Sequence, residues 1–284
     1  MGSMFNLALI AALMYSVPFV LADSLSKRMV AKIGGYNLGV LLLAVGFIPT
    51  VIAAIFVGFG TLSLYVAALS MATGLVISFG YMLFYKSMET EQIANAAAFS
   101  EFGSVLFVVF GFLVFGESIG LIGSVGVAIV FVGATLLVIT EEFKFNKKLM
   151  PAALAFILWS GGFIILAYSI KASDTMAIPL IIARITALIS FIVVARFIGL
   201  KKTKTKVTKH IKGVVATGLL DGTGTAGFGF AIVLAAVGLS GVMNAVMPVL
   251  AAIIGYKYYR ERFTTLQLFG FVIMIIGAIV VSVT

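Results

Sequence analysis

The sequence contains no cysteine and only one histidine, His210, which lies in a run of basic residues. The lack of cysteine excludes disulfide bonds and thiolate metal sites, and one isolated imidazole cannot build a histidine metal site or a catalytic triad. The glycine-rich phosphate loop of nucleotide hydrolases is also missing, which argues against an ATP-driven pump. We therefore expect no metal, no other cofactor and no enzymatic activity.

Charged residues are scarce as well: 10% of the 284 residues are charged and 62% are apolar. This composition indicates a chain that folds in lipid. A hydrocarbon core about 30 Å thick needs roughly 20 apolar residues per helix. We expect an all-α integral membrane protein without a soluble domain. Residues 1–3 are interpreted as a cloning remnant. The apolar stretch that follows is interpreted as a membrane helix and not as a signal peptide. Ten transmembrane helices are predicted, at about 5–22, 36–57, 61–84, 93–115, 119–140, 151–170, 176–198, 213–234, 239–257 and 264–283.

The two halves of the chain resemble each other when the sequence is shifted by 144 residues. Aromatic, small and acidic residues then align, and the matches include Tyr15 with Trp159, Ser16 with Ser160, Gly80 with Gly224, Glu117 with Glu261, and Gly133 with Gly277. Each half holds five predicted helices, and an odd number makes the second half enter the membrane from the opposite face. The sequence thus predicts two inverted five-helix repeats, 4–140 and 148–284, which form one membrane domain with a site near the midplane between them.

Basic residues are confined almost entirely to alternate breaks between the predicted helices and to the helix ends that adjoin these breaks. Of the 19 Lys and Arg residues, only Lys171 and Arg184 lie elsewhere. Because basic loops stay in the cytoplasm, we expect a multi-pass protein of the cytoplasmic membrane with both termini outside. The densest basic run, 196–212, is interpreted as a topology anchor that meets anionic lipid, and no nucleic-acid partner is expected.

Several of these residues together resemble a known family. The aromatic-small pairs Tyr15-Ser16 and Trp159-Ser160, and Pro248 thirteen residues before Glu261, are similar to the drug/metabolite transporter superfamily, specifically its EamA-type ten-helix transporters. The first half departs from this pattern, with Ser104 at the position that corresponds to the proline. Arg184 is similar to the basic residue that is typical of a repeat's second helix in this family.

The resemblance implies a secondary transporter that works by alternating access. We expect it to move a small polar, amino-acid-like metabolite, in the outward direction, with proton coupling and exchange against a counter-substrate both left open. The expected partners are therefore the small-molecule substrate and membrane lipid. The alternative is a transporter of quaternary or lipophilic organic cations, in which Arg184 is held in an internal ion pair.

Away from the helix ends, three charged residues fall inside predicted helices: Glu101, Arg184 and Asp221. Each is costly in lipid, by about 2.5–3.5 kcal/mol on insertion scales, so none should face it. Each lies about eight residues into its helix, which places all three in one central band of the membrane. Arg184 is a candidate anchor for an anionic group of the substrate, and either acid is a candidate site for an ammonium or a proton. A purely structural ion pair between Arg184 and one acid is the alternative.

Aromatic residues supply the remaining candidates for substrate binding. Tyr15, Trp159 and Tyr81 can offer ring faces to a cation or an apolar group. Trp159 is the strongest of the three, because it is the only tryptophan, aligns with Tyr15 and lies in the middle of its helix. Aromatic residues in membrane helices are often packing residues instead, and this interpretation stays open for all three.

Overall fold

The computed structural model describes residues 2–89, 115–116, 120–138, 150–200, 202–203, 206–234, 253–254, 256–257 and 264–282. No strand occurs among these residues. The predicted helices 93–115 and 239–257 lie almost entirely outside the described residues, so the number of ten helices stays a prediction. The described helices are α1 (Gly2–Val45), α2 (Phe47–Val57), α3 (Leu64–Met88), α5 (Gly120–Val138), α6 (Met150–Ser173), α7 (Ala177–Val194), the short 3-10 helix η2 (Val207–His210), α8 (Ile211–Leu234) and α11 (Thr265–Ser282).

Most helix ends lie within a few residues of those predicted. The start of α3 is fixed by Ser63, whose Oγ accepts a hydrogen bond of 3.1 Å from the backbone N–H of Val66. This capping satisfies a donor that the first turn of a helix leaves free. Five described segments are long and apolar enough to cross a membrane, namely Leu13–Val57, Leu64–Met88, Met150–Ser173, Ala177–Val194 and Val207–Leu234.

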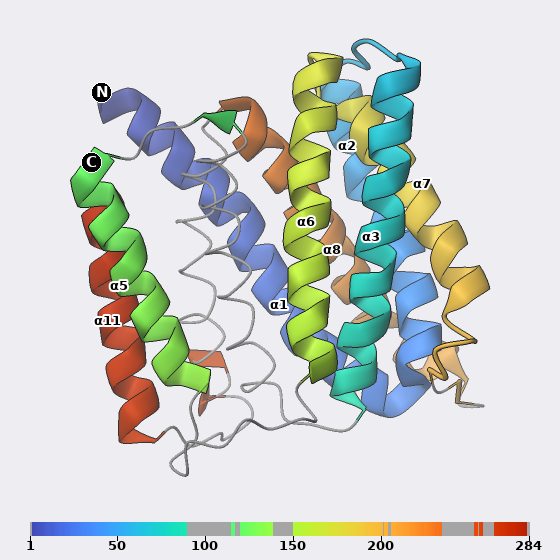
Figure 1. Ribbon diagram of the computed structural model, residues 1–284. Helices are drawn as coiled ribbons and strands as arrows, with labels where there is room; N and C mark the ends of the chain where they lie inside the picture. The colour runs from blue at the N-terminus through green and yellow to red at the C-terminus, as the bar shows by residue number, and fades with distance from the viewer. Residues whose placement is uncertain are drawn as a thin grey trace.

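The predicted break at 23–35 is wrong, because α1 continues as a helix through nearly all of it. The chain turns at Gly34, whose φ of 78° and ψ of 155° interrupt the helix. A positive φ strains any residue with a side chain, and glycine adopts it freely. The chain then runs back across the bundle as the end of α1 and α2 (Figure 1).

Hydrogen bonds place the helix ends at two opposite ends of the bundle. At the basic end, which we define by the turn at Gly34, the end of α3 and residues 196–200 and 206–212, Lys86 Nζ donates to the carbonyl of Gly199 over 2.8 Å. At the opposite end, the N–H of Thr61 before α3 donates to the carbonyl of Ser173 at the end of α6, over 3.0 Å. Helix α3 therefore begins where α6 ends, and the two helices run antiparallel.

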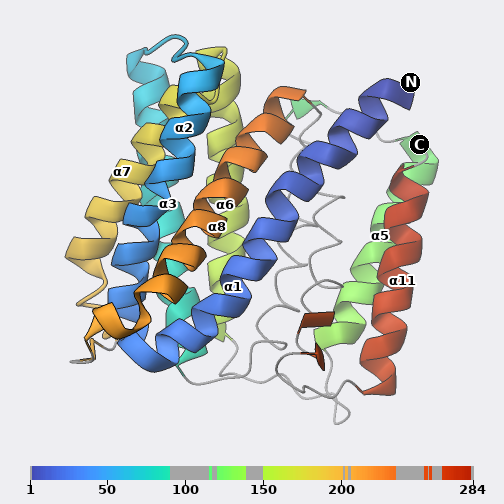
Figure 2. The same ribbon diagram turned by 180° about the vertical axis from the view of Figure 1, so that it is seen from behind.

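The halves of the chain exchange helices in a symmetric way. The most extensive packing joins α1 to α8, α5 to α11 and α3 to α6, so each pair takes one helix from each half. The shift of 144 residues relates α1 to α6, α3 to α8 and α5 to α11. Exchanging the halves therefore converts the α1–α8 pair into the α6–α3 pair and keeps the α5–α11 pair. Partners run in opposite directions (Figures 1 and 2), as inverted repeats require.

The terminal helices of the two halves pack through glycine. A Cβ built on Gly133 of α5 would lie 2.7 Å from the carbonyl oxygen of Gly270 in α11. Reciprocally, a Cβ on Gly277 would lie 2.8 Å from the carbonyl oxygen of Gly126 and 2.6 Å from the backbone nitrogen of Val130. Small residues of this kind let membrane helices approach closely. These glycines thus pack the two halves against each other.

The replacement Gly277→Ala is expected to destabilise the protein. The added methyl group meets backbone atoms, which cannot rotate away, so the two helices must separate at a cost of about 1–3 kcal/mol. Thermal unfolding in detergent measures this effect. A matched control is Gly161→Ala in α6, where a Cβ meets nothing within 4 Å. Equal stability of both variants would contradict the described α5–α11 packing.

Candidate functional site

A buried ion pair joins α7 to α8. Arg184 stands seven residues into α7, and its Nη1 donates to Asp221 Oδ2 over 2.6 Å. The Arg184 side chain is 5% exposed and that of Asp221 is 4% exposed. At 1.5 Å per residue, Asp221 lies about 15 Å from the start of α8 and Arg184 about 10 Å from the start of α7. The helices start at opposite ends, so the pair lies near the middle of the bundle.

Polar side chains from two helices and one backbone carbonyl complete the surroundings of this pair. The hydroxyl of Tyr81, on α3, donates to Asp221 Oδ1. Thr225, one turn after Asp221, accepts a 3.2 Å hydrogen bond from Arg184 Nη2 and donates to the backbone carbonyl of Asp221. The carbonyl of Gly46 also accepts from Arg184 Nη2, over 3.4 Å. Both carboxylate oxygens of Asp221 are thus engaged, whereas Arg184 Nε has no hydrogen-bond partner among the described residues.

Two glycines bring the backbone of α8 close to the break between α1 and α2. A Cβ on Gly222 would lie 2.2 Å from the carbonyl oxygen of Gly46, and a Cβ on Gly46 would lie 2.7 Å from Arg184 Nη2. Distances under 3.0 Å exclude any side chain unless the backbone moves. Glycine at both positions therefore allows the close approach that brings the Gly46 carbonyl to the guanidinium.

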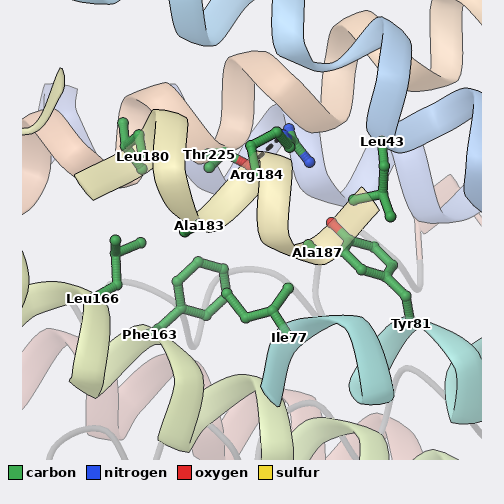
Figure 3. A pocket seen from close by; sticks show the side chains of 10 residues that line it. All are labelled: Leu43, Ile77, Tyr81, Phe163, Leu166, Leu180, Ala183, Arg184, Ala187 and Thr225. Atoms are coloured by element: carbon green, nitrogen blue, oxygen red, sulfur yellow. Dashed lines mark hydrogen bonds between the residues drawn. The ribbon is translucent and has the colours of Figure 1, made fainter. Parts of the chain in front are cut away.

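A small cavity lies beside the ion pair, between helices of both halves (Figure 3). Its volume is about 20 Å³. About one water molecule fits into such a space, so the cavity is closed to a larger ligand in this conformation. Its polar lining comes from Arg184, Tyr81 and Thr225, and its apolar lining comes from Leu43, Ile77, Phe163, Leu166, Leu180, Ala183 and Ala187.

Three of the six predicted site residues are brought together, namely Tyr81, Arg184 and Asp221. The ring of Trp159 packs edge-on against that of Tyr81, with 5.1 Å between the ring centroids. Its Nε1 donates to the carbonyl of Ile77 over 3.3 Å. Trp159 therefore packs against Tyr81 without lining the cavity.

The other two predicted residues are not part of this arrangement. Tyr15 is buried among aromatic rings of α1 and α8, with its ring 5.9 Å from that of Phe228, and it does not line the cavity. Glu101 lies outside the described residues. Both therefore stay predictions as substrate-binding residues, and Tyr15 packs in a place separate from the ion pair.

One acidic residue near the site was missed from the sequence. Asp23 was assigned to the break at 23–35, but it lies within α1, is half-buried and interacts electrostatically with Asp221. The sequence is compatible with a continuous helix here, because neither proline nor glycine interrupts residues 22–33. Three basic residues in this stretch led to the wrong prediction of a loop. Thr225 and Gly46 were also missed, since their roles depend on how the helices are rotated.

Comparison with known proteins places this arrangement in a family. The sequence matches the EamA-like transporter family twice, over residues 4–139 and 147–283. A solved structure titled only "Crystal structure of protein" is similar in fold, with a TM-score of 0.69 and 17% sequence identity over 98% of this chain and 96% of the other. None of the curated proteins matches. Because the two family matches cover nearly the whole sequence, the chain belongs to the EamA-like transporter family and is a multi-pass membrane transporter of the drug/metabolite type.

Proposed function

We propose that this protein is a secondary carrier that moves a small, amino-acid-like metabolite out of the cell by alternating access. The observation that carries the proposal is the guanidinium of Arg184, which is buried near the middle of the bundle and lines a cavity between the halves. A buried charge in a membrane helix marks a substrate or ion pathway by default. A guanidinium is also the side chain best suited to hold a carboxylate through two parallel hydrogen bonds.

The arrangement of the halves supports alternating access. The cavity takes its lining from α1 and α3 of the first half and from α6, α7 and α8 of the second. A relative tilt of the halves would open it toward one end of the bundle at a time. In this conformation the opposite end is held by paired serines, with Ser70 Oγ and Ser169 Oγ 2.7 Å apart. The basic end is held by the hydrogen bond between Lys86 and Gly199.

Transport of an organic cation is the second candidate function. Its supporting observation is the internal ion pair, which leaves Arg184 already neutralised by Asp221. The aromatic residues expected to hold a cation, Tyr15 and Trp159, lie away from the cavity. The first candidate is therefore favoured, because the cavity offers a cation a guanidinium and mainly apolar side chains.

We also propose that the basic end faces the cytoplasm and that both termini face outward. Lys86, Arg196 and Lys202 lie at this end, where Arg196 and Lys202 flank the ring of Tyr36. Because the chain has no cysteine, single introduced cysteines report orientation without background. A membrane-impermeant maleimide is expected to label Leu62→Cys in intact cells and Lys209→Cys only after permeabilisation. The reverse pattern would contradict this orientation.

Counterflow in liposomes that contain only this protein tests the proposed function. Liposomes loaded with an unlabelled amino acid are expected to take up the labelled form from outside, and protein-free liposomes are not. Exchange of quaternary amines without exchange of any amino acid would favour the second candidate function. Cells that overproduce the protein are expected to release its substrate faster, and faster uptake instead would contradict outward transport.

A further inference from the structure

The buried ion pair of the site is neutral as a whole before any substrate enters. Arg184 and Asp221 form one buried ion pair at 2.6 Å. The other described groups that interact electrostatically with Asp221 are Asp23 on α1 and Tyr81 and Tyr85 on α3. Glu101 lies outside the described residues. Where these neighbours keep their charge, a substrate changes the charge of the site only by its own net charge.

The pair nevertheless leaves one strong donor for an anionic group. Asp221 occupies Arg184 Nη1, while Arg184 Nε has no partner among the described residues. The hydrogen bonds of Nη2 are long, at 3.2 Å and 3.4 Å. A carboxylate can therefore bind the edge formed by Nε and Nη2 without displacing Asp221. Two carboxylates on one guanidinium leave an excess negative charge, which a low-dielectric site does not tolerate.

A positive group on the same substrate removes this excess. The counter-charge for an ammonium would come from Asp221, whose carboxylate accepts from the hydroxyl of Tyr81, a residue that lines the cavity. The rest of the lining is apolar, with Leu43, Ile77, Phe163, Leu166 and Leu180, and it matches an aliphatic side chain in polarity. These features together describe a net-neutral amino acid with an apolar side chain.

We propose that the neutralised Arg184–Asp221 pair makes this protein selective for zwitterions with an apolar side chain, which it moves without a net charge and without a coupled proton. This inference rests on the proposed function and adds the substrate class and the energetics of transport. A lone carboxylate would require a proton to balance it, and a lone amine would leave an excess positive charge. Such substrates are disfavoured because they would add an unbalanced charge to a buried site near the middle of the bundle.

The electrical test uses wild-type protein in liposomes and labelled leucine as the probe. A potential of 100 mV would concentrate a substrate that carries one net charge about 50-fold. We expect accumulation to stay within about twofold of equilibrium for either sign of the potential, because no charge moves. A gradient of one pH unit is likewise expected to drive no accumulation. Accumulation driven by the potential or by the pH gradient would overturn the proposal.

The selectivity test compares leucine with two analogues that share its side chain. Isocaproate lacks the ammonium and isoamylamine lacks the carboxylate. Each analogue is expected to compete with leucine at least about tenfold more weakly than unlabelled leucine does, and equal competition by either would overturn the proposal. In Asp221→Asn the ratio of isocaproate to leucine exchange is expected to rise about tenfold, because Arg184 then lacks its counter-ion.

Controls separate this inference from the proposed function. Thr223→Val lies on the exposed side of α8, where the threonine hydroxyl bonds only to the backbone of Leu219, and it is expected to behave as wild type. If Asp221→Asn does not fold, the electrical and selectivity tests on wild-type protein still test the proposed selectivity for zwitterions. Exchange of polar or charged amino acids without exchange of leucine would overturn only the inference. Absence of exchange for every amino acid would overturn the proposed function itself.

Discussion

The replacement Asp221→Asn alone is expected to lower the free energy of unfolding by about 3–5 kcal/mol, because it leaves the guanidinium of Arg184 buried without its counter-ion. The double variant Arg184→Gln/Asp221→Asn is expected to recover most of this loss, because it removes both charges of the pair and leaves neither one unpaired. The asparagine amide introduced by the second replacement keeps an oxygen that can accept the hydrogen bond of Tyr81. Thermal or denaturant unfolding in detergent measures both variants.

Transport is expected to follow a different pattern from stability. The double variant should fold well and yet lose exchange of carboxylate-bearing substrates by at least about 100-fold, since the hydrogen bonds to the charged guanidinium are gone. Thr223→Val serves as the control on the same helix. A double variant that exchanges amino acids at the wild-type rate would show that the pair has a structural role only. A double variant that exchanges organic cations instead would support the second candidate function.

The replacement Gly222→Ala is expected to reduce transport by at least about tenfold and stability by about 1–3 kcal/mol. The new methyl group would lie 2.2 Å from the carbonyl oxygen of Gly46, the same oxygen that accepts from Arg184 Nη2. Relief of this overlap moves α8 away from α2, and Asp221 moves with α8. Because catalytic and binding geometries tolerate only small displacements, a shift of about 1 Å is sufficient to weaken the site.

The control for this variant is Gly161→Ala on α6, where the added methyl group meets no atom within 4 Å. It introduces the same chemical change into another membrane helix. Exchange rates and unfolding temperatures of both variants can be measured side by side. If Gly222→Ala matches Gly161→Ala in both, the close approach of α8 to Gly46 does not position the ion pair.

Much of the fold could be predicted from hydrophobic length and repetition. A helix must be long enough to cross the bilayer, so the positions of α3, α6, α7, α8 and α11 follow from their apolar runs. The first helix was predicted too short because Lys27, Arg28 and Lys32 look like a loop. Basic side chains near a helix end extend toward the headgroups, so such residues do not by themselves end a helix.

The site was only partly predictable from the sequence. The position of a residue along its helix gives its depth in the membrane, but it does not give the direction in which the side chain points. Arg184 and Asp221 were placed at the same depth, and the structure brings them into contact. Their shared neighbours depend on which way each helix faces. The repeat does not supply this information, because Asp221 aligns with Ile77 and Thr225 with Tyr81 in the first half. The two halves thus share their packing glycines, whereas Arg184 and Asp221 have no charged counterpart in the first half.

The most direct measurement of the central claim is a crystal structure of the protein with free selenomethionine bound. This amino acid is a net-neutral zwitterion with an apolar side chain, and its selenium is located by anomalous scattering. The account predicts an anomalous peak among Leu43, Ile77 and Phe163, with the carboxylate at about 2.8 Å from the guanidinium of Arg184. A ligand bound elsewhere, with the cavity beside Arg184 still closed, would contradict it.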